Sequence, residues 1–186
     1  MKDTLKLIFV LTVICATSSA LLAAVYSKTK DPIAASLELR TAGAAAKVMP
    51  AGAALPEKKE IDGETFFIAQ KDGKVAAIAV QGRSGSGYGG EIVLMVGLST
   101  DGKLVDYKKL VASETPGLGT KIESDAFRVP LLGRALNADW RVKKDGGKVD
   151  AITAATISSR AALECIRDAI AKYEKAKEQL GTAETN

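Results

Sequence analysis

The sequence contains no histidine, and this absence narrows the chemistry that the chain can perform. Histidine is the commonest metal ligand and the commonest general base near neutral pH, so sites that depend on it are excluded. The two cysteines, Cys15 and Cys165, are too few for a zinc or iron–sulfur ligand set. Because they also lie far apart in the chain, we expect no metal site and no disulfide.

Aromatic residues and net charge are also scarce. Aromatics make up 5% of the chain and the formal net charge is only +4. No run of basic residues is interleaved with aromatics, so a nucleic-acid partner is not expected. The length of 186 residues predicts one globular domain with an appendage.

Residues 7–26, LIFVLTVICATSSALLAAVY, are uncharged and mostly apolar, and they predict a transmembrane helix after a short start at residues 1–6. As a helix this run spans roughly 30 Å, the thickness of a bilayer core. A cleaved signal peptide is the alternative, with small residues such as Ala23 and Ala24 at its end, but the run is longer than a usual signal core. Lysines flank it on both sides, so positive charge gives no firm orientation.

Residues 27–60 are expected to form a helical linker. Pro32 suits the first turn of a new short helix, and Pro50 with Gly52 predicts its end. The charged stretch from Pro56 to Glu60 is interpreted as a connector.

From residue 61 the pattern changes to that of β-strands. Asp72-Gly73 and Asp101-Gly102 are strong two-residue hairpin turns between apolar runs. A long segment without glycine or proline, residues 160–179, then has apolar residues at helical spacing. We predict an α+β fold at 61–178, an antiparallel sheet packed with helices, followed by a flexible tail at 179–186. The four predicted strands are residues 63–70, 75–82, 91–99 and 103–112.

Hydroxyl side chains cluster on the predicted first turn of the C-terminal helix, in DAITAATISS at residues 150–159. The first turn of a helix carries free backbone N–H groups and the positive end of the helix dipole, and both favour a phosphate group. Helix capping alone is the alternative interpretation of such a cluster. Its hydroxyls belong to Thr153, Thr156, Ser158 and Ser159.

Two further stretches interrupt the regular pattern. GRSGSGYGG, residues 82–90, has glycines that allow close approach to a ligand, and Tyr88 could lie against a flat ring. SETPGLGTK, residues 113–121, has a tight turn at Pro116-Gly117. Taken singly, the first is also explained as a flexible hairpin loop, and the second as a surface turn before the next helix.

The pattern Asp-x-x-Thr-x-Ala-Thr-x-Ser-Ser resembles the flavinylation motif of the FMN-binding domain family. That family includes the G subunit of the Rnf electron-transport complex and the C subunit of the sodium-pumping NADH:quinone reductase. Gly87 to Val93 and Glu114 to Gly119 resemble two other motifs of the family, in the same order. Ala154 stands where the family usually has glycine, which is costly only if the backbone there has a positive φ. Ser113 stands where the family often has histidine.

The resemblance implies a covalent FMN whose phosphate is esterified to Thr156. It implies that Thr153 and Ser159 bond the phosphate region, and that Asp150 fixes the turn or is read by a flavin transferase. The segment from Glu114 to Gly119 is expected to line the ring, and the glycine-rich stretch to border the ring or the ribityl tail. The remaining cofactor-binding residues implied are Ala155, Ser158, Glu114, Thr115, Gly117, Leu118, Gly119, Gly87, Tyr88 and Gly89.

By this resemblance, closest to the Rnf G subunit, the chain is a membrane-anchored flavoprotein that relays electrons in an ion-translocating ferredoxin:NAD oxidoreductase. Its implied partners are the other subunits of the complex, a flavin transferase and membrane lipid. The implied location is the inner membrane, with the soluble domain on the periplasmic or extracellular side. The alternatives are a component like the C subunit of the quinone reductase, a stand-alone FMN carrier, or a membrane-anchored binding module without flavin.

Overall fold

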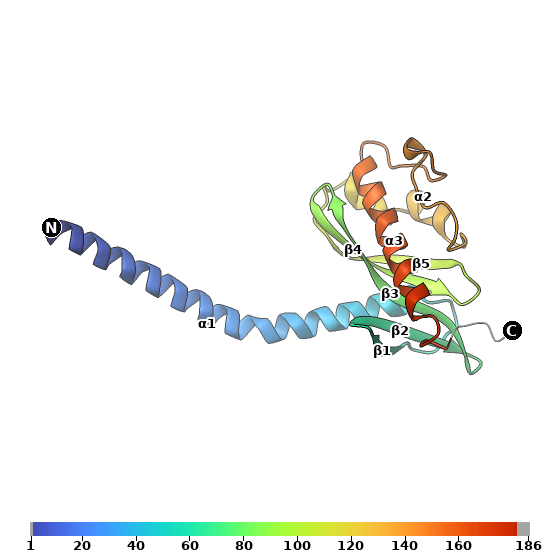
Figure 1. Cartoon of the computed structure of the whole chain (residues 1–186), viewed down its shortest axis with the longest axis horizontal. Helices are drawn as coiled ribbons and strands as arrows, with labels where there is room; N and C mark the ends of the chain where they lie inside the picture. The colour runs from blue at the N-terminus through green and yellow to red at the C-terminus, as the bar shows by residue number, and fades with distance from the viewer. Residues whose placement is uncertain (1, 182–186) are drawn as a thin grey trace. The chain divides into compact units, whose positions relative to one another are not determined.

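The computed structural model describes residues 2–181 of the chain (Figure 1). The chain divides into two compact units, Met1–Arg40 and Thr41–Asn186. Residues 182–186, most of the predicted tail, lie outside the described residues. The start of that tail is a turn at residues 179–181, in which Leu180 is buried.

One helix, α1 at Lys2–Lys47, contains both the predicted transmembrane run and most of the predicted linker. It is long and apolar enough to cross a membrane, and its most apolar stretch is not buried. The prediction of a new helix at Pro32 is wrong, because Pro32 lies inside α1. A proline removes one backbone hydrogen bond of a helix, and the alanine-rich residues that follow have high helix propensity and continue it.

Five antiparallel strands form a single sheet in the order β1-β2-β3-β4-β5. The prediction of a connector at Pro56–Glu60 is wrong, because residues 57–60 belong to strand β1, which pairs with β2. Asp62 and Gly63 join the two strands with φ values of 51° and 78°, the positive values that a tight hairpin turn requires. The strands are β1 Glu57–Ile61, β2 Glu64–Lys71, β3 Lys74–Gly87, β4 Gly90–Ser99 and β5 Leu104–Ala112.

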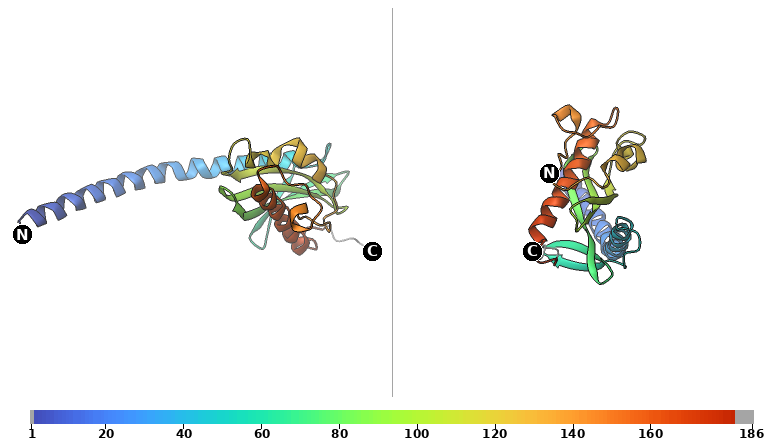
Figure 2. Two further views of the ribbon diagram at one scale, coloured as in Figure 1. Left: turned by 90° about the horizontal axis from the view of Figure 1, so that it is seen from above. Right: turned by 90° about the vertical axis from the view of Figure 1, so that its right-hand side faces the viewer.

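Both faces of this sheet are covered, because successive side chains point to opposite faces and apolar residues lie on each of them. On one face, residues such as Val80 and Leu94 pack against helix α3 at Thr156–Ala176. On the other face, Ala79 and Met95 pack against Ala45 in the last turns of α1. Figures 1 and 2 show α3 lying across its face of the sheet. Short helical turns fill the chain between β5 and α3; they are η1 Gly119–Glu123, α2 Asp125–Arg128, η2 Val129–Leu131 and η3 Lys143–Asp145.

Helix α3 approaches the sheet very closely at Gly82. A Cβ atom on Gly82 would lie 1.8 Å from the carbonyl oxygen of Cys165. Cys165 is buried, and its thiol donates to the carbonyl of Ile92 at 3.3 Å. Burial raises the pKa of this thiol to about 12, so it stays protonated near neutral pH and is a poor nucleophile. Cys165 therefore serves as a small packing residue.

The Gly82→Ala variant tests this contact. The added methyl group has to displace the α3 backbone, so we expect a loss of stability of about 1–3 kcal/mol, as for overpacking of a core. The measurement is Tm by circular dichroism on the full chain in detergent. Gly85→Ala is the matched control on the same strand, because nothing lies within 4 Å of its Cβ position. Equal melting of the two variants would contradict the close contact.

Candidate functional site

Helix α3 begins at Thr156, and within residues 2–181 no side chain caps it. Its N-cap residue is Ala155, and its first backbone hydrogen bond runs from Ser159 N–H to the Ala155 carbonyl at 3.0 Å. The N–H groups that precede this bond have no acceptor in the helix, and they lie at the positive end of the helix dipole. The interpretation in which the hydroxyl cluster only caps the helix is therefore not supported.

The two serines of this first turn, Ser158 and Ser159, are buried and hydrogen-bond other protein groups. The Ser159 hydroxyl donates to the Ala155 carbonyl at 2.9 Å and accepts from Ile152 N–H at 2.9 Å. It is fully buried, and in this structure it closes the turn that presents Thr156; its bond to a phosphate stays a prediction. Ser158 is also buried, and its hydroxyl donates to the Glu114 carboxylate.

Glu114 is a buried carboxylate that connects three segments. One oxygen, Oε2, accepts from the Ser158 hydroxyl on α3, and the other, Oε1, accepts from Gly89 N–H at 3.1 Å. A Cβ atom on Gly119 would lie 2.2 Å from Oε2. Glu114, which is predicted to line the ring, is thus buried and accepts hydrogen bonds from protein groups.

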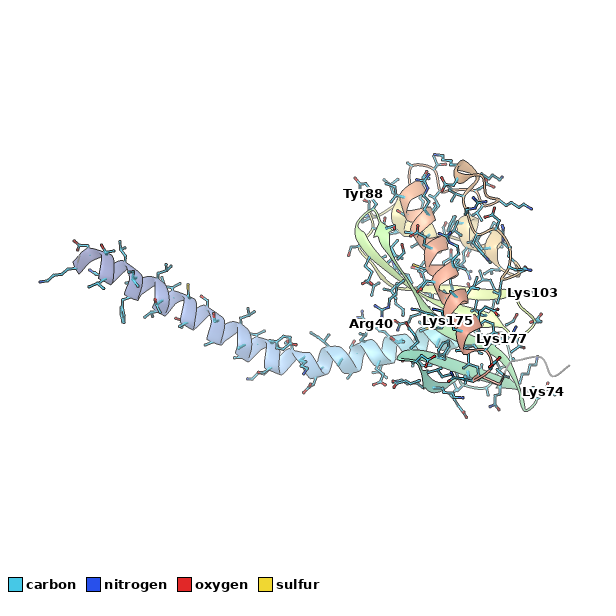
Figure 3. The ribbon with its side chains drawn as sticks, in the orientation of Figure 1. Arg40, Lys74, Tyr88, Lys103, Lys175 and Lys177 are labelled. Atoms are coloured by element: carbon cyan, nitrogen blue, oxygen red, sulfur yellow. The ribbon has the colours of Figure 1, made fainter. Side chains whose placement is uncertain are left out.

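The glycine-rich stretch at residues 82–90, which is predicted as a loop, forms the end of the β3–β4 hairpin. Strand β3 continues to Gly87, strand β4 begins at Gly90, and Tyr88-Gly89 make the turn. A Cβ atom on Gly89 would lie 1.8 Å from the carbonyl of Ser113, so the hairpin tip lies directly against the segment after β5. Tyr88 is 72% exposed at this tip (Figure 3).

A cavity of about 500 Å³ lies between the hairpin tip, the 115–119 turn and the start of α3. This volume is within the range of sites for small organic ligands, about 300–1,000 Å³. Leu118 and Ile157 supply apolar surface, and Thr156 supplies a hydroxyl at the helix start. The full lining is Tyr88, Thr115, Leu118, Gly119, Ala154, Ala155, Thr156, Ile157 and Ser158.

Several predicted site residues lie outside this lining. Gly117 forms the turn at φ 75°, and its N–H donates to the Thr120 hydroxyl at 3.0 Å. Thr153 is exposed in the turn before α3. Asp150 accepts from Lys143 Nζ at 2.8 Å, which ties the motif to η3. Gly87 packs against the Glu114 side chain, since its Cβ position lies 2.8 Å from Oε1.

The sequence interpretation missed Lys144, Ala154 and Ile157 as site residues. Lys144 Nζ lies 3.1 Å from Thr156 Oγ1 and donates to it. Ala154 has a φ of 61°, the left-handed conformation in which an alanine is strained. The resemblance gave a signal for Ala154, because a glycine is usual there; for Lys144, only the basic pair before Gly146-Gly147 could have drawn attention.

Together these features define a class of protein. It is an α+β ligand-binding domain that presents a hydroxyl, an uncapped helix start and an apolar cavity suited to a phosphate-bearing ring compound.

Comparison with known proteins gives the family. The FMN-binding domain pattern matches residues 87–171. The chain is 34% identical over 155 residues to the G subunit of the ion-translocating oxidoreductase complex of Haemophilus influenzae, covering 75% of each chain. It is 38% identical over 120 residues to the corresponding G subunit of Shewanella baltica, covering 61% of this chain and 57% of that one. The chain belongs to the FMN-binding domain family that includes these G subunits.

Solved structures give the same fold. The C subunit of the Na⁺-translocating NADH-quinone reductase from Parabacteroides distasonis matches with a TM-score of 0.50 and 22% identity, over 66% of this chain and 64% of that one. NqrC from Shewanella oneidensis matches with a TM-score of 0.51 and 17% identity, over 75% and 73%. The α+β prediction is confirmed. The match to the Shewanella baltica protein spans little more than half of that relative's length.

Replacing Glu114 tests its role as the link between the segments. Glu114→Gln keeps the shape but replaces one acceptor oxygen with an NH2 group, so either the Ser158 hydroxyl loses the acceptor for its proton or Gly89 N–H loses its acceptor. We expect a loss of about 1–3 kcal/mol, the cost of an unsatisfied buried group, seen as a lower Tm. Glu91→Gln on β4 is the control, because its side chain is 54% exposed in a surface ion pair. If Glu114→Gln has the same Tm as Glu91→Gln, Glu114 does not link these segments.

Ala154→Gly is expected to stabilise the chain. Glycine adopts a φ of 61° without strain, so we expect a gain of about 1 kcal/mol in the free energy of unfolding. Chemical denaturation of the full chain measures it. In the control Ala155→Gly, the backbone has a φ of −137°, which any residue adopts, so no gain is expected. If both variants lose stability, the strain assigned to Ala154 is absent.

Proposed function

We propose that this chain binds FMN covalently through Thr156 and relays electrons as a membrane-anchored subunit of an Rnf-type ion-translocating oxidoreductase complex. The observation that carries the proposal is the position of Thr156: its side chain lines the cavity at the uncapped start of α3. Membership of the FMN-binding domain family supports the identity of the ligand.

The residues present fit FMN. Thr156 and the free N–H groups of the first turn suit the phosphate, and the apolar surfaces of Leu118 and Ile157 suit the ring. Tyr88 at the hairpin tip adds an aromatic face to the same cavity. When bound, FMN supplies the redox chemistry, while the protein binds and orients it.

Attachment requires an activated donor. A direct reaction with FMN would expel hydroxide, so the donor carries its phosphate in an anhydride, as a flavin dinucleotide does. Thr156 Oγ1 forms the bond to phosphorus while the anhydride bond breaks, the nucleoside monophosphate leaves and the hydroxyl proton is released. A flavin transferase is proposed as the catalyst, because the site has no histidine to act as a base.

The anchor and partners follow from the same proposal. Helix α1 spans the inner membrane in contact with lipid, and the soluble domain lies on the periplasmic or extracellular side. Other subunits of the complex exchange electrons with the chain, and the complex couples reduced ferredoxin and NAD to sodium or proton movement.

The Thr156→Val variant tests covalent attachment. Valine keeps the shape of threonine but has no hydroxyl, so the chain co-expressed with a flavin transferase should lack the added mass of one FMN ester. The measurement is intact mass, with in-gel fluorescence after denaturation. Thr65→Val on β2, outside the cavity lining, is the matched control, and it should keep the flavin.

A wild-type chain with the mass of its amino acids alone would overturn the proposal and favour a binding module without flavin. If the wild-type chain does carry flavin, co-purification separates the flavin-bearing alternatives, because Rnf subunits, quinone-reductase subunits and a lone carrier give different sets of partners.

A further inference from the structure

The turn η3 holds a lysine over the first residue of α3. Lys144 Nζ donates to Thr156 Oγ1 at 3.1 Å, across a sequence separation of 12 residues. Thr156 is a neutral partner, whereas the charges on either side of Lys144 have partners of opposite charge. Lys143 pairs with Asp150 at 2.8 Å, and Asp145 pairs with Arg160 at 2.6 Å.

The backbone of this loop is constrained to place the turn there. Gly146 ends η3 in the left-handed conformation, with a φ of 78°. A Cβ atom on Gly147 would lie 2.2 Å from the carbonyl of Arg141, so the two sides of the loop pack tightly. Hydrogen bonds from Lys143 N–H to the Val149 carbonyl, at 2.8 Å, and from Val149 N–H to the Arg141 carbonyl, at 3.1 Å, close its base.

The ion pairs on either side of Lys144 fasten the turn to both ends of the motif. Asp150 lies at the start of the motif, and Arg160 immediately follows it. The Arg160 guanidinium, which hydrogen-bonds Asp145, lowers the pKa of that carboxyl, so the carboxyl stays charged and paired. The carboxylates of Asp145 and Asp150 are thus neutralised by cations other than Lys144.

We propose that Lys144 is the counter-ion of the phosphodiester on Thr156, and that it draws the donor's phosphate to the hydroxyl during attachment. This inference rests on the proposed function. An esterified Thr156 places one negative charge beside the ammonium group, in addition to the favourable field of the helix start. Lys144 is exposed, so its contribution is modest and weakens as salt is added.

The test compares three variants of the full chain in detergent with purified flavin transferase and flavin dinucleotide. Lys144→Met should slow single-turnover attachment about two- to fivefold at low ionic strength, the scale of an exposed ion pair. The difference should shrink at high salt. Lys144→Arg keeps the charge and should restore most of the rate.

Lys148→Met is the charge-matched control. Lys148 is an exposed lysine of the same loop. Its positive charge is one of the causes that lower the pKa of Asp139. It should attach flavin at the wild-type rate. A second measurement, the phosphorus-31 resonance of the loaded chains, should shift in Lys144→Met relative to both wild type and Lys148→Met.

Equal rates and equal phosphorus resonances for Lys144→Met and Lys148→Met would overturn the assignment of Lys144 while leaving Thr156 as the attachment residue. A rate loss that Lys144→Arg does not restore would also overturn it, because charge would then not be the cause. If the wild-type chain gains no flavin, the proposed function falls, and this inference falls with it.

Discussion

The candidate site depends on one buried carboxylate, that of Glu114. Its two oxygens accept hydrogen bonds from the β3–β4 hairpin tip and from the first turn of α3, and Glu114 itself belongs to the segment between them. A buried carboxylate is costly unless its oxygens are satisfied. The same bonds that satisfy Glu114 therefore hold together the three segments that enclose the cavity.

The glycines around Glu114 have a common physical role. Gly89 and Gly119 lie where a Cβ atom would collide with Ser113 or with the carboxylate itself. At both positions the missing side chain allows neighbouring groups to approach closely, and this close approach rather than flexibility explains the glycine. Strands β3 and β4 accordingly pair as far as Gly87 and Gly90, with a shift of register between Ser84 and Gly87. Leu118 and Ile157 supply the apolar lining of the cavity.

Much of the sheet and of the site follows from local sequence. Aspartate–glycine turns and alternating apolar residues predict β2 to β5, because hairpins pair segments that are neighbours in the chain. Strand β1 is missed because its residues are almost all charged, and its pairing depends on β2. The continuous α1 is missed because a proline at an internal position reads as a helix start.

The site, like the sheet, is predicted from the sequence only in part. Motifs at residues 82–90, 113–121 and 150–159 place the hairpin tip, the turn and Thr156, but a sequence does not show which polar groups each hydroxyl contacts. Ser159 bonds its own turn, Glu114 bonds protein groups and Lys144 reaches Thr156 only because the loop at Gly146-Gly147 folds back. Composition and spacing do not encode these contacts individually.

The strand order has a consequence for biosynthesis. All five strands pair with their neighbours in sequence, so the sheet can assemble progressively while the ribosome is still translating the chain. Helix α3 follows the strands in the chain and contributes Thr156, Ile157 and Ser158 to the cavity wall. Under the proposed attachment, an enzyme that recognises this assembled surface would therefore meet Thr156 only after translation has passed α3.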